Sequence, residues 1–176
     1  MTEKIIIAGS GGQGIMLLGK IIAEAAMMEK KFVTWIPSYG AEVRGGTAHC
    51  MVTISDKEIG SPWVKKADTL IIMNAPSLQR FKARLEKGGL LFINSSLVDV
   101  SECSDGRAIA HPFTDIAIKL GNIKVANMVA LGNYLTKKKI LKEKTIIEVM
   151  RKIAPPDKLD LISININALE QGMGLR

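Results

Sequence analysis

The stretch IIIAGSGGQG, residues 5–14, decides the fold of this 176-residue chain. A short β-branched run from Lys4 to Ala8 stops at Gly9, and from Gly12 to about Glu29 apolar residues recur at helical spacing. This order predicts a strand, a glycine loop and a helix. Residues 9–14 also satisfy G-x-G-x-x-G, and backbone N–H groups at a helix N-terminus, with no Cβ in the way, can receive an anion or a phosphate.

The residues after the glycine loop limit what it can bind. A dinucleotide site needs an acidic residue about 20 positions further on to hold the ribose, but no Asp or Glu lies between Glu29 and Glu42. This weakens the case for NAD. No Gly-Lys-Ser/Thr follows the loop, so it is not a P-loop nucleotidase. The alternative is structural, in which the glycines only make a tight turn and let helix and sheet approach.

Further strands and helices alternate along the chain. We predict strands at residues 32–36, ended by Pro37, and at 48–55, 69–73, 90–93 and, as an edge strand, 107–110. We predict a helix over 76–87 closed by Gly88-Gly89, a helical pattern after Phe113, a helix over 145–153 and a tail from Pro155 or Pro156. This alternation predicts an α/β fold: a doubly wound, mainly parallel, Rossmann-like sheet with helices on both faces, in a single domain over residues 1–176.

The charge balance is basic, with 24 Lys+Arg against 17 Asp+Glu and a net charge of +7. Such a charge suits nucleic acid, an acidic partner protein or a phosphate-bearing ligand. The densest cluster, residues 137–139 with Lys142 and Lys144, sits where a helix should end and complements the helix dipole. The aromatic residues are scattered and do not interleave with this cluster, so we expect no nucleic-acid binding.

Cysteine content and hydropathy exclude other classes of protein. Cys50 and Cys103 cannot supply the four thiolates of an iron–sulfur cluster, and only His49 and His111 could assist. We expect His49 to be a packed or hydrogen-bonded strand residue, Cys50 a small buried hydrophobe, and Cys103 exposed in a polar segment. No apolar run reaches the roughly 20 residues of a membrane span, and the first leads straight into the glycine loop. We therefore expect a cytoplasmic protein that does not bind membranes.

Residues 38–46, SYGAEVRGG, form a glycine-bounded polar loop after a predicted strand. Its functional side chains and closing glycines are Ser38, Tyr39, Glu42, Arg44, Gly45 and Gly46. In open α/β sheets, loops at the carboxyl ends of strands are where ligands or partners are met. The alternative is a self-satisfied loop in which Glu42 pairs with Arg44 or caps the backbone.

Four stretches carry a family resemblance: GSGGQGIMLLGKIIAEA (9–25), SYGAEVRGGTA (38–48), SPWVKKADTLIIMN (61–74) and NMVALGNYL (127–135). Together they resemble the gamma subunit of 2-oxoacid:ferredoxin oxidoreductases, over roughly Lys4 to Leu135. The combination is far more specific than the glycine loop alone. The resemblance implies an enzyme complex that decarboxylates a 2-oxoacid on thiamine diphosphate, passes electrons through [4Fe–4S] clusters to ferredoxin, and delivers the acyl group to coenzyme A.

The resemblance also implies a division of labour between subunits. Thiamine diphosphate, Mg²⁺ and the clusters are expected on alpha-, beta- and delta-type partner subunits, and ferredoxin is a partner only indirectly. The sequence agrees, because it lacks cluster cysteines and its Asp105-Gly106 pair follows Ser104 rather than the glycine of a thiamine-type Gly-Asp-Gly. We expect this chain to hold no cofactor alone and to be inactive in isolation. Similar gamma chains serve pyruvate, 2-oxoglutarate, branched oxoacids and indolepyruvate, so the substrate is predicted only as a 2-oxoacid.

Three roles for this chain follow, and none assigns it a catalytic or metal-ligating residue. The cofactor-binding candidates are Gly9, Ser10, Gly11, Gly12, Gln13, Gly14, Ser38, Tyr39, Glu42, Arg44, Gly45 and Gly46. The glycine loop could bind a phosphate of coenzyme A with Arg44 as a second donor, the SYGAEVRGG loop could be an assembly surface, or the domain could be a passive clamp. We favour assembly with a contribution to the ligand site.

Two rival functions stay open. The first is a stand-alone oxidoreductase that uses the glycine loop for NAD(P) or a flavin, and the second is a scaffold that binds no small molecule. Because the chain is 47% hydrophobic and its first predicted helix is apolar on most of its circumference, we also expect an apolar surface patch on the isolated chain, or a homodimer that covers it.

Overall fold

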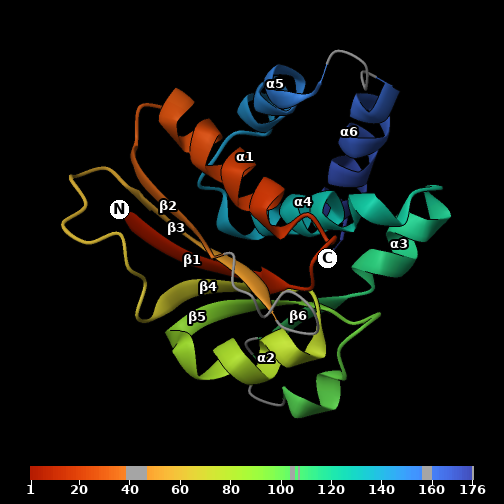
Figure 1. The fold of residues 1–176 in the computed structure, drawn as a ribbon, viewed down its shortest axis with the longest axis horizontal. Helices are drawn as coiled ribbons and strands as arrows, with labels where there is room; N and C mark the ends of the chain where they lie inside the picture. Colours follow the sequence, from red (N-terminus) through yellow and green to blue (C-terminus); the bar gives the residue numbers. More distant parts are fainter. Residues whose placement is uncertain (39–46, 104–105, 107, 156–159, 176) are drawn as a thin grey trace.

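The computed structural model describes residues 1–38, 47–103, 106, 108–155 and 160–175. They contain one sheet with the strand order β2-β3-β1-β4-β5-β6 (Figure 1). The strands are β1 (Thr2–Gly9), β2 (Phe32–Ser38), β3 (Ala48–Ser55), β4 (Ala67–Ile72), β5 (Leu85–Asn94) and β6 (Ala108–His111). β1, β4, β5 and β6 pair in parallel, whereas β3 is antiparallel to both β1 and β2. Five of the six described strands therefore run in one direction, which confirms the mainly parallel sheet.

Helices cover both faces of this sheet, as predicted. They are α1 (Ile15–Met28), α2 (Ala75–Phe81), α3 (Phe113–Lys119), α4 (Ala126–Lys138), α5 (Glu143–Ile153) and α6 (Asp160–Met173), with short 3-10 helices η2 (Lys82–Arg84), η3 (Val100–Glu102) and η4 (Ile123–Val125). In Figure 1, α1, α4, α5 and α6 lie on one side of the sheet and α2 on the other. Two hydrophobic clusters, one on each side, form the core.

β1 belongs to both clusters. Ile5 and Ile7 pack in the cluster that contains α1, and Ile6 and Ala8 in the cluster that contains α2. All four side chains are fully buried. A strand covered on both faces requires an uninterrupted apolar run, and the sequence supplies one here.

α1 packs closely on β3. A side chain at Gly19 would collide with the Cys50 sulfur, so glycine lets the helix and the strand approach. Burial raises the pKa of the Cys50 thiol to about 12, which fits the predicted small buried hydrophobe. α1 is apolar on most of its circumference but is not covered all round, because Leu17 is 45% exposed and Met28 is also exposed.

Two predicted boundaries are wrong. β2 does not end before Pro37 but continues through it to Ser38, which a proline allows because β2 is an edge strand. The helix predicted over 76–87 ends at Phe81, and Gly88-Gly89 lie inside β5. A Cβ at Gly89 would lie 2.9 Å from the Asp68 carbonyl oxygen, and the register of β5 against β4 shifts at this point. The glycine pair therefore serves an irregular strand pairing and not a helix end.

The tail predicted after Pro155 or Pro156 is also wrong, because α6 occupies residues 160–173. α6 crosses α4 at two glycines. A Cβ at Gly132 would lie 2.8 Å from the Met173 nitrogen, and a Cβ at Gly172 would lie 2.8 Å from the Val129 carbonyl carbon. The contact is thus between backbones. Tertiary packing on α4 stabilises a segment whose isoleucines and asparagines have modest helix propensity.

A buried ion pair joins the start of β1 to the end of α4. The Lys138 Nζ lies 3.0 Å from Glu3 Oε2, and the Thr69 hydroxyl donates to Glu3 Oε1 at 2.6 Å. Glu3 is only 4% exposed. Burial raises the pKa of Glu3 above its ordinary value, against the opposing effects of Thr69 and Lys138. The lysine cluster at residues 137–139 ends α4, as predicted.

Replacing Gly132 with alanine should lower the free energy of unfolding by about 2–3 kcal/mol, because the backbone atoms facing it cannot rotate away. Gly60→Ala is the control, since a Cβ there meets no atom within 4 Å. Urea denaturation monitored by circular dichroism measures both. Equal stability of the two variants would show that the α4–α6 crossing is not as close as described.

Lys138→Met should leave the Glu3 carboxylate buried without its cation and cost about 3 kcal/mol at pH 7. The pKa of Glu3 then rises further. Since a raised carboxyl pKa penalises the folded state only while the group is ionised, the deficit should shrink as the pH falls through the raised pKa of Glu3 towards the ordinary value of 4.5. Urea denaturation at pH 7 and pH 4 tests this, with exposed Lys137→Met as the control. A deficit that does not change with pH would contradict the assignment.

Candidate functional site

The carboxyl ends of the parallel strands meet at one edge of the sheet, and the crossover direction changes there. α1 follows β1 on one face, and α2 follows β4, the neighbouring strand, on the other face (Figure 1). In open α/β sheets this reversal leaves a crevice between the two strand ends, and ligands bind in it. The glycine loop, residues 9–14, lies at this point.

The glycine loop is held in shape by its own residues. Gly12 and Gly14 have φ angles of +88° and +70°, which favour glycine. The Ser10 amide donates to Gln13 Oε1 at 2.7 Å, and Gln13 Nε2 donates to the Met73 carbonyl oxygen at 3.2 Å. Gln13 therefore braces the loop against the end of β4. Its side chain points inward and is not offered to a ligand.

The loop keeps some backbone donors for a ligand. The Ser10 amide is bound to Gln13, and the Gln13 amide donates to the Ser10 carbonyl at 3.3 Å. Among the described residues, none accepts a hydrogen bond from the amides of Gly11, Gly12 or Gly14. These three amides lie at the N-terminus of α1, where the helix dipole favours an anion.

Two asparagines bond the glycine loop directly, and a third bonds the Met73 carbonyl, which also accepts from Gln13 of the loop. Asn74 Nδ2, after β4, donates to Ser10 Oγ at 2.6 Å, while its Oδ1 accepts from the Ser77 amide and caps α2. Asn94, at the end of β5, donates to the Met73 carbonyl at 3.3 Å. Asn127 Nδ2, on α4, donates to the Gly14 carbonyl at 3.2 Å.

Asn94 and Asn127 are almost fully buried. Asn94 also exchanges two hydrogen bonds with Thr114, donating to its hydroxyl at 2.8 Å and accepting from its amide at 3.2 Å. A side chain at Gly14 would collide with the Asn127 amide. The buried amides are therefore paired, and they fix the position of the loop relative to β4, β5 and α4.

A pocket of about 410 Å³ opens beside the loop. It is lined by Ser10, Gly11, Gly12, Gly14, Ile15, Met16, Leu17, Ser38 and Ala48. The structure thus brings Ser38, at the end of β2, to the glycine loop. The other predicted residues of the SYGAEVRGG loop, Tyr39, Glu42, Arg44, Gly45 and Gly46, lie outside the described residues.

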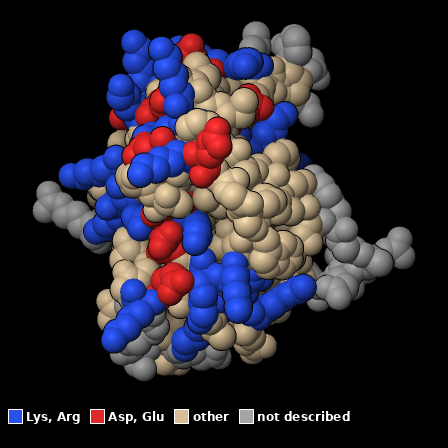
Figure 2. Space-filling model, turned by 90° about the vertical axis from the view of Figure 1, so that its left-hand side faces the viewer, with Lys and Arg blue, Asp and Glu red and all other residues tan. Residues whose placement is uncertain are grey.

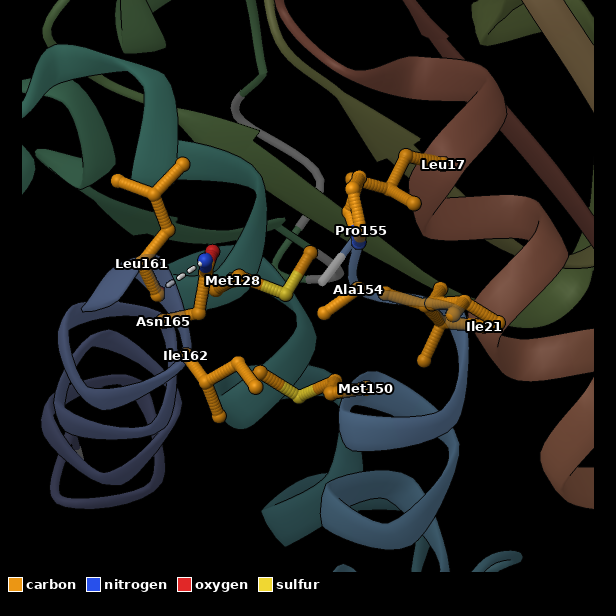
Figure 3. A pocket seen from close by; sticks show the side chains of 10 residues that line it. Leu17, Ile21, Met128, Met150, Ala154, Pro155, Leu161, Ile162 and Asn165 are labelled. Atoms are coloured by element: carbon orange, nitrogen blue, oxygen red, sulfur yellow. Dashed lines mark hydrogen bonds between the residues drawn. The ribbon is translucent and has the colours of Figure 1, made fainter. Parts of the chain in front are cut away.

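A second, apolar pocket of about 260 Å³ lies between α1, α4, α5 and α6 (Figure 3). Met128 and Met150 face each other across it with aliphatic side chains around them. Among its described lining residues, Asn165 has the one polar side chain, and it donates to the Leu161 carbonyl at 2.6 Å. None of these described lining residues is charged, so the glycine-loop pocket is the better candidate for an anionic ligand. Leu17 lines both pockets.

The other titratable candidates are structural. The buried His49 ring lies 4.8 Å from the Phe81 ring, as expected for a packed strand residue. Burial, and then the charge of Lys137, lowers the pKa of His111. Cys103 is buried, which corrects the prediction of an exposed thiol. Within the described ranges, no group of three or more His, Cys, Asp or Glu could hold a metal ion, and no helix could cross a membrane.

Sequence reasoning missed the asparagines and Thr114. A single asparagine after a strand resembles any turn residue, and only the strand order brings Asn74 beside Ser10 and Asn94 beside Met73. The available signal was weak. Asn74 and Asn94 each follow directly after a fully apolar strand end, where an ordinary loop places no fixed polar group.

Comparison with known proteins gives a consistent result. A family model described as pyruvate ferredoxin/flavodoxin oxidoreductase matches residues 4–175. Ketoisovalerate oxidoreductase subunit VorA of Methanothermobacter marburgensis is 36% identical over 171 residues, 96% of this chain and 35% of VorA. The chain thus spans about a third of that relative. 2-Oxoglutarate synthase subunit KorC of the same organism is 33% identical over 183 residues, 99% of this chain and 97% of KorC.

A solved structure shows the same fold over nearly the whole chain. The keto/oxoacid ferredoxin oxidoreductase gamma subunit of Geobacter sulfurreducens superposes with a TM-score of 0.81 at 28% identity. The match covers 97% of this chain and 95% of that one.

Asn74→Ala should cost about 1–2 kcal/mol of stability, because it removes both the α2 cap and the bond to Ser10. Asn74→Asp should cost less, since its carboxylate keeps the cap and suits the helix N-terminus. Urea denaturation measures the difference. Asn122, whose Oδ1 only caps η4 by accepting from the Lys124 amide, is the matched site for the same two substitutions. If Asp and Ala at position 74 are equally destabilising, the capping role is wrong.

Proposed function

Because the chain belongs to the pyruvate ferredoxin/flavodoxin oxidoreductase family, we propose that it is the gamma-type subunit of a multisubunit 2-oxoacid:ferredoxin oxidoreductase. Such a complex decarboxylates a 2-oxoacid oxidatively, reduces ferredoxin and releases an acyl-CoA. KorC and the Geobacter gamma subunit, which this chain matches over nearly their whole lengths, support the subunit role. The proposed partners are alpha-, beta- and delta-type subunits, and ferredoxin is met only through them.

The described residues do not fit an iron–sulfur cluster or thiamine diphosphate. Cys50 and Cys103 are both buried, and they lie in hydrophobic clusters on opposite faces of the sheet. Among the described residues, no group of three or more His, Cys, Asp or Glu could hold a metal ion. We therefore assign these cofactors to the partner subunits and derive no catalytic step from this chain. The isolated chain should be inactive.

We assign the glycine loop a supporting role in binding coenzyme A. The amides of Gly11, Gly12 and Gly14, which donate to no described residue, and the N-terminus of α1 suit a phosphate group. The hydroxyls of Ser10 and Ser38 line the same pocket, and no acidic residue among its described lining would repel an anion. Arg44, in the adjoining loop, is proposed as a further donor to a phosphate.

The two rival functions make different predictions. A stand-alone oxidoreductase would bind NAD(P)H or a flavin through the same loop, and a pure scaffold would bind no small molecule. The lack of an Asp or Glu within β2 or at its carboxyl end disfavours NAD. The exposed apolar side chains of α1 and β2, Leu17, Met27, Met28 and Phe32, are proposed to be covered by a partner subunit, or by a second copy when the chain is isolated.

Gly12→Asp tests the ligand assignment. A Cβ at Gly12 meets no atom within 4 Å, so the new carboxylate should stand in the loop and repel a phosphate. Gly12→Asn is the matched control, because it has the same shape and the same positive φ but no charge. In the assembled complex, the KM for coenzyme A should rise at least roughly tenfold for Asp relative to Asn, with little change for the 2-oxoacid.

The outcomes separate the candidates. Equal KM values for the two variants would remove coenzyme A from the glycine loop and leave the subunit role intact. Oxoacid-dependent dye reduction by the purified chain alone would contradict the subunit role. Tight binding of NADH, NADPH or FMN in calorimetry would favour the stand-alone oxidoreductase.

A further inference from the structure

The excess positive charge lies at the edge of the sheet opposite the glycine loop. This amino edge consists of the strand starts, the helix ends and the loops between them, at residues 1–4, 29–31, 56–68, 82–87 and 137–144. These segments carry fourteen lysines and arginines against seven acidic residues, so they account for the whole net charge of +7. Figure 2 shows this side of the molecule, with basic side chains over much of it.

Helix dipoles explain only part of this charge. Residues 30–31 follow the C-terminal end of α1, and residues 137–139 form the last turn and C-cap of α4, where lysines complement the dipole. Lys57, Lys65 and Lys66 lie instead in the loop from β3 to β4, and Lys87 lies near the start of β5. All four are exposed and none is at a helix end. Their clustering needs another reason.

An exposed tryptophan stands among these lysines. Trp63 is 59% exposed although it is held in a fixed position. The Arg84 guanidinium lies 5.6 Å from the Trp63 ring centre and donates to the carbonyls of Val64 and Lys65. Lys66 Nζ donates to the Ala83 carbonyl at 2.6 Å. Burial also lowers the pKa of Arg84, which stays charged.

The loop from β3 to β4 is therefore held against η2 by these hydrogen bonds, and the Val64 side chain of this loop is buried. A rigid tryptophan next to an arginine is the composition typical of an interface anchor, because little side-chain entropy is lost when the ring is covered. A solvated surface alone would not require the tryptophan. We call Trp63, Lys65, Lys66, Arg84 and Lys87 the Trp63 patch.

We propose that the Trp63 patch docks an acidic face of another protein subunit, with Trp63 seated in an apolar recess of that subunit. The proposal rests on the proposed role as a subunit of a complex. A nucleic acid is disfavoured because Trp63 is one isolated aromatic residue, whereas single strands bind along successive stacking positions. The patch and the glycine loop lie at opposite ends of β1, so a docked subunit leaves the ligand pocket open.

Zero-length carbodiimide cross-linking of the assembled complex tests the location of this interface, because the reagent joins lysines only to carboxylates in direct contact. Cross-links from Lys65, Lys66 or Lys87 to Asp or Glu of another subunit are expected. An assembled complex whose cross-links all avoid these lysines would overturn the proposal and leave the subunit role standing. Failure of the chain to join the other subunits at all would overturn both.

Two sets of variants test the energetics in the same complex. Trp63→Ala should weaken binding of this chain to the remaining subunits roughly 30-fold or more, and Trp63→Phe less. Lys65→Glu/Lys87→Glu should slow association about tenfold at low salt, whereas Lys119→Glu/Arg151→Glu, with the same change of charge away from the patch, should not. Because Trp63 is exposed, the midpoint of thermal unfolding of Trp63→Ala should equal that of the wild type. Wild-type binding by Trp63→Ala and by the charge-reversal pair would refute the proposal.

Binding of a fluorescence-labelled 20-nucleotide single strand of nucleic acid tests the alternative partner. No saturable binding at physiological salt is expected. Tight binding that Trp63→Ala abolishes would assign the patch to nucleic acid and overturn the protein partner.

Discussion

β1 is buried on both faces, and this constraint positions everything else. Its side chains divide between the two clusters, so the strand must lie in the interior of the sheet with helices above and below. β1 leads to α1 on one face of the sheet, and its neighbour β4 leads to α2 on the other. The glycine loop consequently lies where the crossover direction reverses, which is where open α/β sheets leave a crevice. The apolar run of β1 thus determines both the position of the core and the position of the glycine loop.

The carboxyl edge depends on polar side chains that serve the protein before any ligand. Gln13 of the loop donates to the Met73 carbonyl. Asn74 donates to the Ser10 hydroxyl of the loop, and Asn127 donates to the Gly14 carbonyl. An unpaired amide in these buried positions would be costly, so each pairing specifies one loop conformation. The amides of Gly11, Gly12 and Gly14 are then fixed in position at the α1 N-terminus. Preorganisation of this kind lowers the entropy lost when an anion binds.

Much of the fold could be predicted from local patterns, and the failures have physical causes. The β-branched run of β1 and the apolar spacing of α1 are strong local signals. Gly88-Gly89 is ambiguous, because the same pair can end a helix or serve an irregular strand, and only the contact with Asp68 decides. α6 has no strong local signal, since its stability comes from α4. In the site, the glycine loop and Ser38 were predicted, but Asn74, Asn94 and Asn127 come together only through the strand order.

The backbone contact between Gly132 and α6 has a consequence for biosynthesis. α6 is the last helix of the described chain, and during translation it leaves the ribosome after the sheet and α4 are complete. Until then the nascent protein exposes the glycine face of α4 and the methionines of the apolar pocket. During this interval an apolar groove lined by Met128 and Met150 is not yet covered by α6. Packing of α6 on α4 then completes this part of the hydrophobic core.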